Sequence, residues 1–163
     1  MARSLRGGLG FSAVLGFGLL AAVAGCAPAP PPPTVVNLTL SASLDVNPSQ
    51  SGQAAPVQIV VYQLASASGF NGAEFFQLFN KDAATLGADM LKRDQFILAP
   101  GETKTATLMP TDAVKTLGVF AAYQGYQAVK WRGTVDIPPH QTTSVTVTAA
   151  KSGLTVTAGK PGP

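Results

Sequence analysis

Cysteine, histidine and charged residues are scarce in this 163-residue chain, and each scarcity excludes a class of protein. The single cysteine, Cys26, cannot form an intramolecular disulfide, so the fold depends on a hydrophobic core. One histidine and one thiol are too few for a zinc cluster. The sequence contains no P-loop, dinucleotide-binding fingerprint or calcium loop, so we expect no metal, no cofactor and no small-molecule substrate.

Catalytic groups are also sparse. The eight acidic residues are scattered, and no local pair has the spacing of a general acid and a general base. The only histidine, His140, lies beside prolines in residues 138–141, which is typical of a solvated turn. A G-x-S-x-G nucleophile elbow is absent as well. We therefore expect that the protein is not an enzyme.

The net charge of +3 does not indicate a nucleic-acid partner. Arg3 and Arg6 belong to an N-terminal segment that is expected to be removed. Without these two, the 11 basic residues become nine against eight acidic ones, a difference of +1. The remaining chain has no basic cluster, so the electrostatic footprint of a phosphate-binding protein is missing.

Residues 1–25 are typical of a secretory signal peptide, because Arg3 and Arg6 precede an uncharged, apolar or small stretch in residues 9–24. About 16 weakly apolar residues fall short of the about 20 that a membrane-spanning helix needs. The stretch ends in Val23-Ala24-Gly25-Cys26, which resembles the bacterial lipobox, where an aliphatic residue and two small residues precede a lipidated cysteine. Cys26 is therefore predicted to carry a covalent lipid that anchors the protein without spanning the membrane.

Residues 26–34 are predicted to be the lipidated cysteine and a proline-rich tether that follows it. Five of the eight residues after Cys26 are prolines, which lack the amide donor that a helix or a sheet interior requires. In polyproline II geometry, at about 3.1 Å per residue, eight residues reach roughly 25 Å. In bacterial lipoproteins an Asp after the cysteine favours the inner membrane, whereas this chain has Ala27. We expect lipid anchoring at the periplasmic face of the outer membrane.

Hydrophobic periodicity predicts a domain of short strands in residues 35–157, followed by a disordered tail in residues 158–163. Alternating residues or short apolar runs predict eight strands, in residues 36–46, 57–64, 95–98, 103–108, 117–123, 129–137, 143–149 and 154–157. Residues 57–64 are apolar on both parities, as in a strand that is covered on both faces. The turn signal Pro100-Gly101 predicts a hairpin between the third and fourth of these strands.

One helical segment interrupts the strands. Asn71 is the predicted N-cap because Glu74 follows three residues later, with Phe70 and Phe75 spaced as a hydrophobic staple. Residues 82–87 predict a second short helical turn. The first helix carries an apolar stripe, formed by Phe75, Phe76, Leu78 and Phe79. Together the elements predict an all-β fold, a two-sheet β-sandwich with one inserted helical segment.

Short motifs along the domain add a family resemblance. They are Asn47-Pro48, Gly52, Pro56-Val57, Val60, Tyr62-Gln63-Leu64, Phe70, Ala73, Glu74-Phe75-Phe76, Leu86-Gly87, Leu98, Pro100-Gly101-Glu102, Leu117-Gly118-Val119, Ala121-Ala122-Tyr123 and Trp131-Arg132. In this order, and behind a lipobox, the domain resembles the TssJ family of outer-membrane lipoproteins of the bacterial type VI secretion system. The resemblance implies a transthyretin-like β-sandwich. It also implies binding to the periplasmic region of the inner-membrane protein TssM and a role in assembling the membrane complex.

The same resemblance implies a partner-binding site, because in the TssJ family the loop between the first two strands contacts TssM. By position, the residues of this loop are Val46, Asn47, Pro48, Ser49, Gln50, Ser51, Gly52, Gln53, Ala54 and Ala55. A long loop rich in Gly, Pro, Ser and Gln can project toward a partner. Relatives often carry charged residues here, whereas Ser49, Gln50 and Gln53 are neutral, which predicts binding with little electrostatic steering.

A second function stays open from the residues alone, that of a ligand-binding or envelope-stress periplasmic lipoprotein. In that case five aromatic residues would line a pocket instead of a core, namely Phe75, Phe76, Phe79, Tyr123 and Trp131. A helix packed on a sheet explains the same phenylalanines without a ligand, and we favour it.

Overall fold

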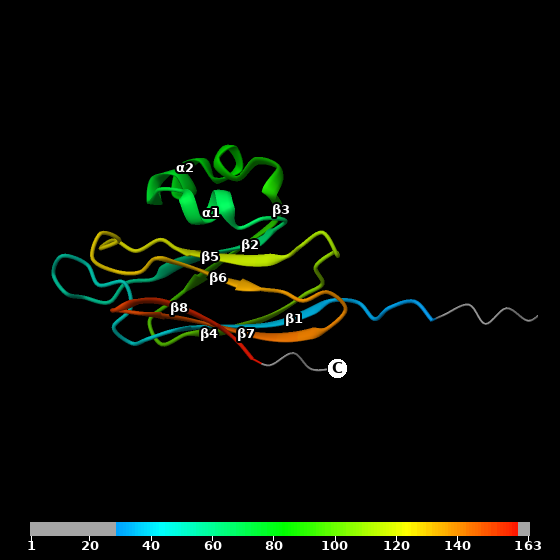
Figure 1. Ribbon diagram of the computed structural model, residues 1–163. Coiled ribbons are helices and arrows are strands. Elements are labelled where there is room, and N and C mark those ends of the chain that lie inside the picture. The colour runs from blue at the N-terminus through cyan, green and yellow to red at the C-terminus, as the bar shows by residue number, and fades with distance from the viewer. Residues whose placement is uncertain (1–28, 160–163) are drawn as a thin grey trace, which may run out of the picture. The chain divides into compact units, whose positions relative to one another are not determined.

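The strands form a two-layer sandwich in the computed structural model, which describes residues 29–159 (Figure 1). One four-stranded sheet has the order β4-β1-β7-β8, and the other has the order β3-β2-β5-β6. The strands are β1 (Val35–Ala42), β2 (Val57–Leu64), β3 (Met90–Leu98), β4 (Thr103–Leu108), β5 (Thr116–Ala121), β6 (Arg132–Asp136), β7 (Thr142–Ala150) and β8 (Gly153–Ala158). The predicted two-sheet β-sandwich is confirmed. Cys26 and the signal peptide lie outside the described residues.

Strand β1 lies inside the first sheet, antiparallel to β4 and parallel to β7. Its residues alternate between the two faces, as the sequence predicts, and Val36, Leu38 and Leu40 are fully buried between the sheets. Ile59 and Val61 of β2 belong to the same buried cluster from the second sheet. Burial of a large aliphatic side chain stabilises a fold by about 1.5–3 kcal/mol, so these paired faces hold the sandwich together.

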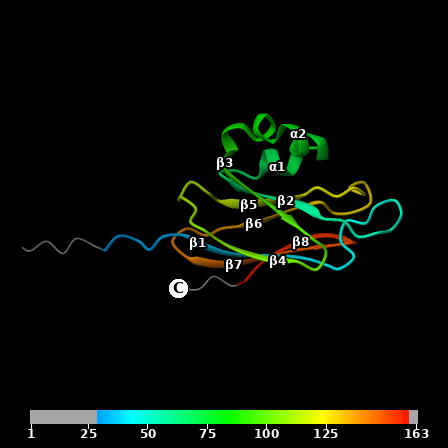
Figure 2. The same cartoon turned by 180° about the vertical axis from the view of Figure 1, so that it is seen from behind.

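The helical segment covers the outer face of the second sheet (Figures 1 and 2). It consists of α1 (Ser68–Gly72), α2 (Phe75–Leu86) and the short 3₁₀ turn η1 (Gly87–Asp89). Val60 and Tyr62 of β2 point into this outer layer, where they are buried together with Phe70 and Leu78. Strand β2 is therefore covered on both faces, which confirms the prediction from its continuous apolar run.

One hydrogen-bonded cluster fastens the second half of α2 to the sheet. The hydroxyl of Tyr62 donates to Oδ2 of Asp82 at 3.0 Å, and Nε of Arg93 donates to the same oxygen at 2.7 Å. Burial alone would raise the pKa of Asp82, but the hydrogen bonds from Arg93, Tyr62 and a backbone amide hold this pKa below its usual range. The carboxylate therefore stays charged at neutral pH and ties the helix to strands β2 and β3.

Strand β1 ends at Ala42, so the prediction of a strand through Val46 is wrong for its last residues. The chain turns instead: the amide of Val46 donates to the carbonyl of Ser43 at 3.2 Å, and Oγ of Ser43 donates to Asp45 at 2.6 Å. Leu44, expected on the buried side, is 82% exposed. Alternation of residue types can continue through a turn, and it does not show where the pairing with the neighbouring strands stops.

The predicted hairpin between residues 95–98 and 103–108 is also wrong. Strand β3 pairs with β2 in the second sheet, whereas β4 pairs with β1 in the first. The turn at Pro100-Gly101 does form, but the amide of Gly101 donates to the carbonyl of Ser43 at 3.2 Å and draws the chain to the other sheet. A turn signal predicts a local reversal and does not determine which sheet the next strand joins.

The main helix begins at Phe75, not after Asn71, which lies inside α1. The amide of Glu74 donates to Oε1 of Gln77 at 2.7 Å, so Glu74 is the N-cap in place of the predicted Asn71. The same capping pattern fits both positions, and the local hydrogen bonds decide between them. At Lys81 a φ of −144° interrupts the helix, so the residues that follow form the predicted second helical turn.

The C-terminal strands β7 and β8 form where they are predicted, while β6 is shorter than predicted and begins at Arg132. Strand β8 includes Ala158, and the amide of Gly159 donates to the carbonyl of Ser144 at 2.7 Å. The paired strand thus extends beyond the predicted domain boundary at residue 157. Within residues 29–159, no helix combines the length and the apolar character needed to cross a membrane.

Candidate functional site at the loop end of the sandwich

Three of the connections at one end of the sandwich, here called the loop end, form the candidate site (Figures 1 and 2). They are residues 43–56 between β1 and β2, residues 122–131 between β5 and β6, and the turn at residues 151–152 between β7 and β8. Residues 31–34 enter β1 at the opposite end, here called the tether end. The predicted partner-binding loop therefore lies at the end of the sandwich away from residues 31–34.

The base of the partner-binding loop is closed and buried. Val46 is fully buried, and its carbonyl accepts a hydrogen bond from the amide of Ala55 at 3.1 Å. Asn47 has a φ of 47°, in the left-handed region that Asn adopts more readily than most residues. Its Nδ2 donates to the carbonyl of Pro56 at 2.8 Å. These bonds join the two ends of the loop, so the loop projects as a closed unit.

Asn47 also holds the neighbouring connection against the loop. The amide of Gln124 donates to Oδ1 of Asn47 at 2.8 Å, although the two residues are 77 positions apart. Because Asn47 is only 4% exposed, this side chain is shielded from water while it bonds both connections. An open depression of about 500 Å³ lies between the two connections, lined by Pro48, Ser49, Gln50, Gln124 and Gly125.

The tip of the loop is a defined turn. The amide of Ser49 donates to the carbonyl of Gln53 at 2.8 Å, and the amide of Gly52 donates to the carbonyl of Ser49 at 2.9 Å. Gly52 has a φ of 79°, a conformation that glycine adopts without steric cost. Gln50 and Gln53 are exposed. Of the ten residues assigned to partner binding, the first two belong to the buried base, and the exposed ones gather at the tip.

Asn47→Ala is expected to lower the free energy of unfolding by about 2 kcal/mol. The change removes the two part-buried hydrogen bonds that Asn47 makes with the amide of Gln124 and the carbonyl of Pro56, and each bond contributes about 0.5–1.5 kcal/mol. Urea unfolding followed by the fluorescence of Trp131 measures the effect. The control Gln50→Ala, at the exposed tip, should stay within about 0.5 kcal/mol of the unchanged chain. Equal stability of the two variants would contradict the role assigned to Asn47.

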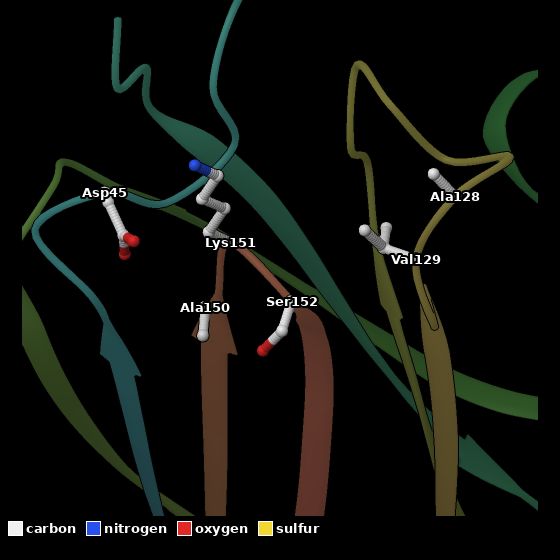
Figure 3. Close-up of a pocket in the computed structure, with 6 residues that line it drawn as sticks. All are labelled: Asp45, Ala128, Val129, Ala150, Lys151 and Ser152. Atoms are coloured by element: carbon white, nitrogen blue, oxygen red, sulfur yellow. The ribbon is translucent and has the colours of Figure 1, made fainter. Parts of the chain in front are cut away.

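A second open depression of about 560 Å³ lies where all three connections meet (Figure 3). It is lined by Asp45, Ala128, Val129, Ala150, Lys151 and Ser152. Asp45 and Lys151 give its rim charges of opposite sign, and Asp45 is held by the hydroxyl of Ser43 at 2.6 Å. The rest of its lining consists of the apolar side chains of Ala128, Val129 and Ala150 and the hydroxyl of Ser152.

The five aromatic residues that would line a ligand pocket divide between core and surface. Trp131 packs edge-on against Phe75, with ring centroids 5.3 Å apart, and Tyr123 is buried. Phe76 and Phe79 are 54% and 47% exposed. The predicted packing of the helix on the sheet is confirmed for Phe75 and wrong for these two, because Phe75 and Leu78 supply the buried contact of this part of α2.

A third open depression of about 260 Å³ lies between α2 and the β5–β6 connection, lined by Phe75, Phe76, Phe79, Ala122, Tyr123, Gln124 and Tyr126. Its volume falls below the about 300–1,000 Å³ of small-molecule pockets. Tyr126 is the residue here that sequence analysis missed. Its ring stacks on Phe75, with centroids 4.2 Å apart. The only sequence signal for it is an aromatic residue in an otherwise small and polar connection.

His140 occupies the predicted turn, at the tether end. Its backbone has a φ of 60°, and its amide donates to Oγ1 of Thr34 at 2.9 Å. Its Nδ1 lies 3.0 Å from the carbonyl of Pro32, and its Nε2 lies 3.7 Å from Asp112. These contacts fasten the β6–β7 turn to the start of the folded unit. In the described part of the chain, His, Cys, Asp and Glu side chains form no group of three that could hold a metal ion.

Comparison with known proteins identifies similar chains. A family model described as type VI secretion lipoprotein, with the names VasD, EvfM and TssJ, matches residues 34–152. The type VI secretion lipoprotein TssJ1 from Pseudomonas aeruginosa is 33% identical, with a TM-score of 0.76 over 81% of this chain and 100% of that chain. Among curated protein sequences, none matches.

Two further solved structures are similar. Serratia marcescens Lip, described as a membrane-bound component of the type VI secretion system, is 30% identical, with a TM-score of 0.71 over 77% of this chain and 98% of that chain. A chain in the structure described as the T6SS protein TssM C-terminal domain (869–1107) from EAEC is 23% identical, with a TM-score of 0.63 over 78% of this chain and 98% of that chain. At that lower identity the likeness shows the shared sandwich fold alone.

Proposed function

This chain belongs to the TssJ family of type VI secretion lipoproteins, and we propose that it links the outer membrane to the periplasmic region of a TssM-like inner-membrane protein. In this role it helps to assemble the membrane complex of the secretion system. Two structures that contain related chains are described as a type VI membrane complex and as a TssM C-terminal domain, which supports the proposal.

One observation carries the proposal: the loop with a defined shape lies at the end of the sandwich opposite to the one where residues 31–34 enter β1. A lipid on Cys26 and a proline-rich segment would attach the tether end to the membrane, with a reach of roughly 25 Å in residues 27–34. The loop end then remains free for a partner. Two or more acyl chains provide durable attachment, whereas one chain binds marginally.

The closed base of the loop suits it for binding. Asn47 joins the two ends of the loop and the neighbouring connection through hydrogen bonds of 2.8 Å each. A loop that already holds its bound shape loses less conformational entropy when a partner binds. We assign the contact mainly to the exposed tip, residues 48–54, because the base is committed to the fold.

Binding is expected to depend weakly on salt. The tip residues Ser49, Gln50 and Gln53 are neutral, so screening of charges removes little of their contribution. Calorimetric titration of the full chain in detergent against the partner's periplasmic region, in about 50 mM and about 200 mM salt, should give affinities within about threefold of each other. Absence of binding at both salt concentrations would contradict the proposed function. A steep fall with salt would contradict the neutral tip as the main contact.

A further inference from the structure

Four aromatic rings form a cluster on the surface between α2 and the β5–β6 connection, here called the aromatic cradle (Phe75, Phe76, Phe79 and Tyr126). Phe75 lies in its centre, stacked against Phe79 on one side at 5.9 Å and against Tyr126 on the other at 4.2 Å between centroids. Phe76 packs edge-on against Phe75 and Tyr126, with both centroid distances 5.3 Å. The rings support one another, so the open depression they line is preformed.

The cradle exposes apolar area that the fold itself does not require. Phe76 and Phe79 are 54% and 47% exposed, on a helix whose neighbouring residues Phe75 and Leu78 already supply its contact with the sheet. Two phenylalanines beside each other on a helix surface are a cost in water unless something covers them. Contiguous apolar patches of this kind with polar surroundings are typical of interaction surfaces.

The cradle is continuous with the partner-binding loop. Gln124 lines both the depression of the cradle and the depression beside the loop tip. The backbone amide of Gln124 donates to the buried side chain of Asn47. This bond fixes the β5–β6 connection, which carries Tyr126 of the cradle, relative to the loop. A partner that covers the loop tip would therefore reach the cradle without a gap.

The lining of the cradle defines the chemistry of its occupant. All seven residues that line its depression are neutral, and five of them are aromatic. A volume of about 260 Å³ is below the usual range of small-molecule pockets, but an open aromatic pocket of this size fits one large side chain. A charged side chain would lose its hydration there without a counter-charge.

We propose that the aromatic cradle is a second contact surface for the periplasmic partner that binds the loop, and that it receives a large apolar side chain from an uncharged segment of this partner. This inference rests on the proposed function. A lipid surface is a poorer occupant, because the tether enters the sandwich at the opposite end and the cradle lining lacks the basic residues that attract anionic headgroups. Buried aromatic anchors in preformed pockets commonly dominate the affinity of an interface.

The double variant Phe76→Ser with Phe79→Ser tests the inference in the full chain. Calorimetric titration against the partner's periplasmic region should show binding about 30-fold weaker than that of the unchanged chain. The matched control is Leu91→Ser with Met109→Ser, which removes two other exposed apolar side chains, on β3 and after β4, and should bind like the unchanged chain. Urea unfolding of each variant shows that the fold is kept.

Photocrosslinking provides a second readout that does not depend on the serine substitutions. The photoreactive residue p-benzoylphenylalanine at position 79 should crosslink the partner, and the same residue at position 109 should not. If the unchanged chain binds while the cradle variant binds equally well and position 79 gives no crosslink, the cradle inference is overturned and the proposed function stands. If the unchanged chain does not bind at all, both are overturned.

Discussion

A chain with only Gly and Ser in residues 48–53 of the loop is expected to bind the periplasmic partner about 100-fold more weakly, or not measurably. The substitutions are Pro48→Ser, Gln50→Gly and Gln53→Gly, which together leave Gly and Ser throughout residues 48–53. They remove the exposed amide side chains and the proline, and they loosen a tip that the Ser49–Gln53 hydrogen bond now defines. Asn47 is kept, so the base of the loop and its bond to Gln124 remain. Calorimetric titration of the full chain measures the loss.

The matched control for the loop variant lies at the tether end. Pro139→Ser with Gln141→Gly changes the same residue types in an exposed turn, away from the loop end. This variant should bind the partner like the unchanged chain. If the loop variant and the turn variant bind equally well, the assignment of partner binding to residues 46–55 is wrong.

Cys26→Ser is expected to abolish membrane attachment of the chain. Serine lacks the nucleophilic thiolate that accepts the lipid, so neither lipidation nor the anchoring that several acyl chains supply can occur. Membrane fractionation should find the variant as soluble protein or as uncleaved precursor, and mass spectrometry should find no acylated N-terminal peptide. Unchanged fractionation into the outer membrane would contradict the lipoprotein assignment of Cys26.

A change beside the cysteine distinguishes the loss of the anchor from altered sorting. Ala27→Asp keeps the thiol, so the chain should remain acylated and membrane-bound. Asp in this position favours the inner membrane in bacterial lipoproteins, and the variant should move there. If Ala27→Asp also became soluble, the effect of Cys26→Ser would reflect a damaged export signal instead of a missing lipid.

Much of the fold could be predicted because burial leaves a periodic trace in the sequence. Val36, Leu38 and Leu40 alternate with polar residues since one face of β1 is buried, and β2 lacks alternation since both of its faces are covered. The hairpin error concerns contacts that no local pattern contains. The Pro100-Gly101 turn forms as predicted, but β4 pairs with β1, and the turn itself bonds to Ser43, far away in the chain.

The candidate site was located by resemblance, and its physical basis appears only in the fold. Loop composition predicts a projecting connection, yet it does not reveal that Asn47 bonds to an amide 77 positions away. The aromatic cradle could not be predicted for the same reason. Phe75 and Tyr126 are far apart in the sequence, and their rings come into contact only in the folded chain. Closely spaced phenylalanines in a helix predict one buried face, and the pattern does not tell which of them stay exposed. The exposure of Phe76 and Phe79 is what supports the proposed second contact surface.

Co-flotation with lipid vesicles tests the central claim most directly, because it requires the anchor and the loop in one molecule. The full chain, purified from membranes and reconstituted into phosphatidylethanolamine and phosphatidylglycerol vesicles, is mixed with the soluble periplasmic region of the TssM-like partner and centrifuged through a density gradient. The account predicts that the partner floats with vesicles that carry the unchanged chain, and stays at the bottom with the loop variant or with Cys26→Ser. A partner that floats equally with the loop variant, or never floats with the unchanged chain, would contradict it.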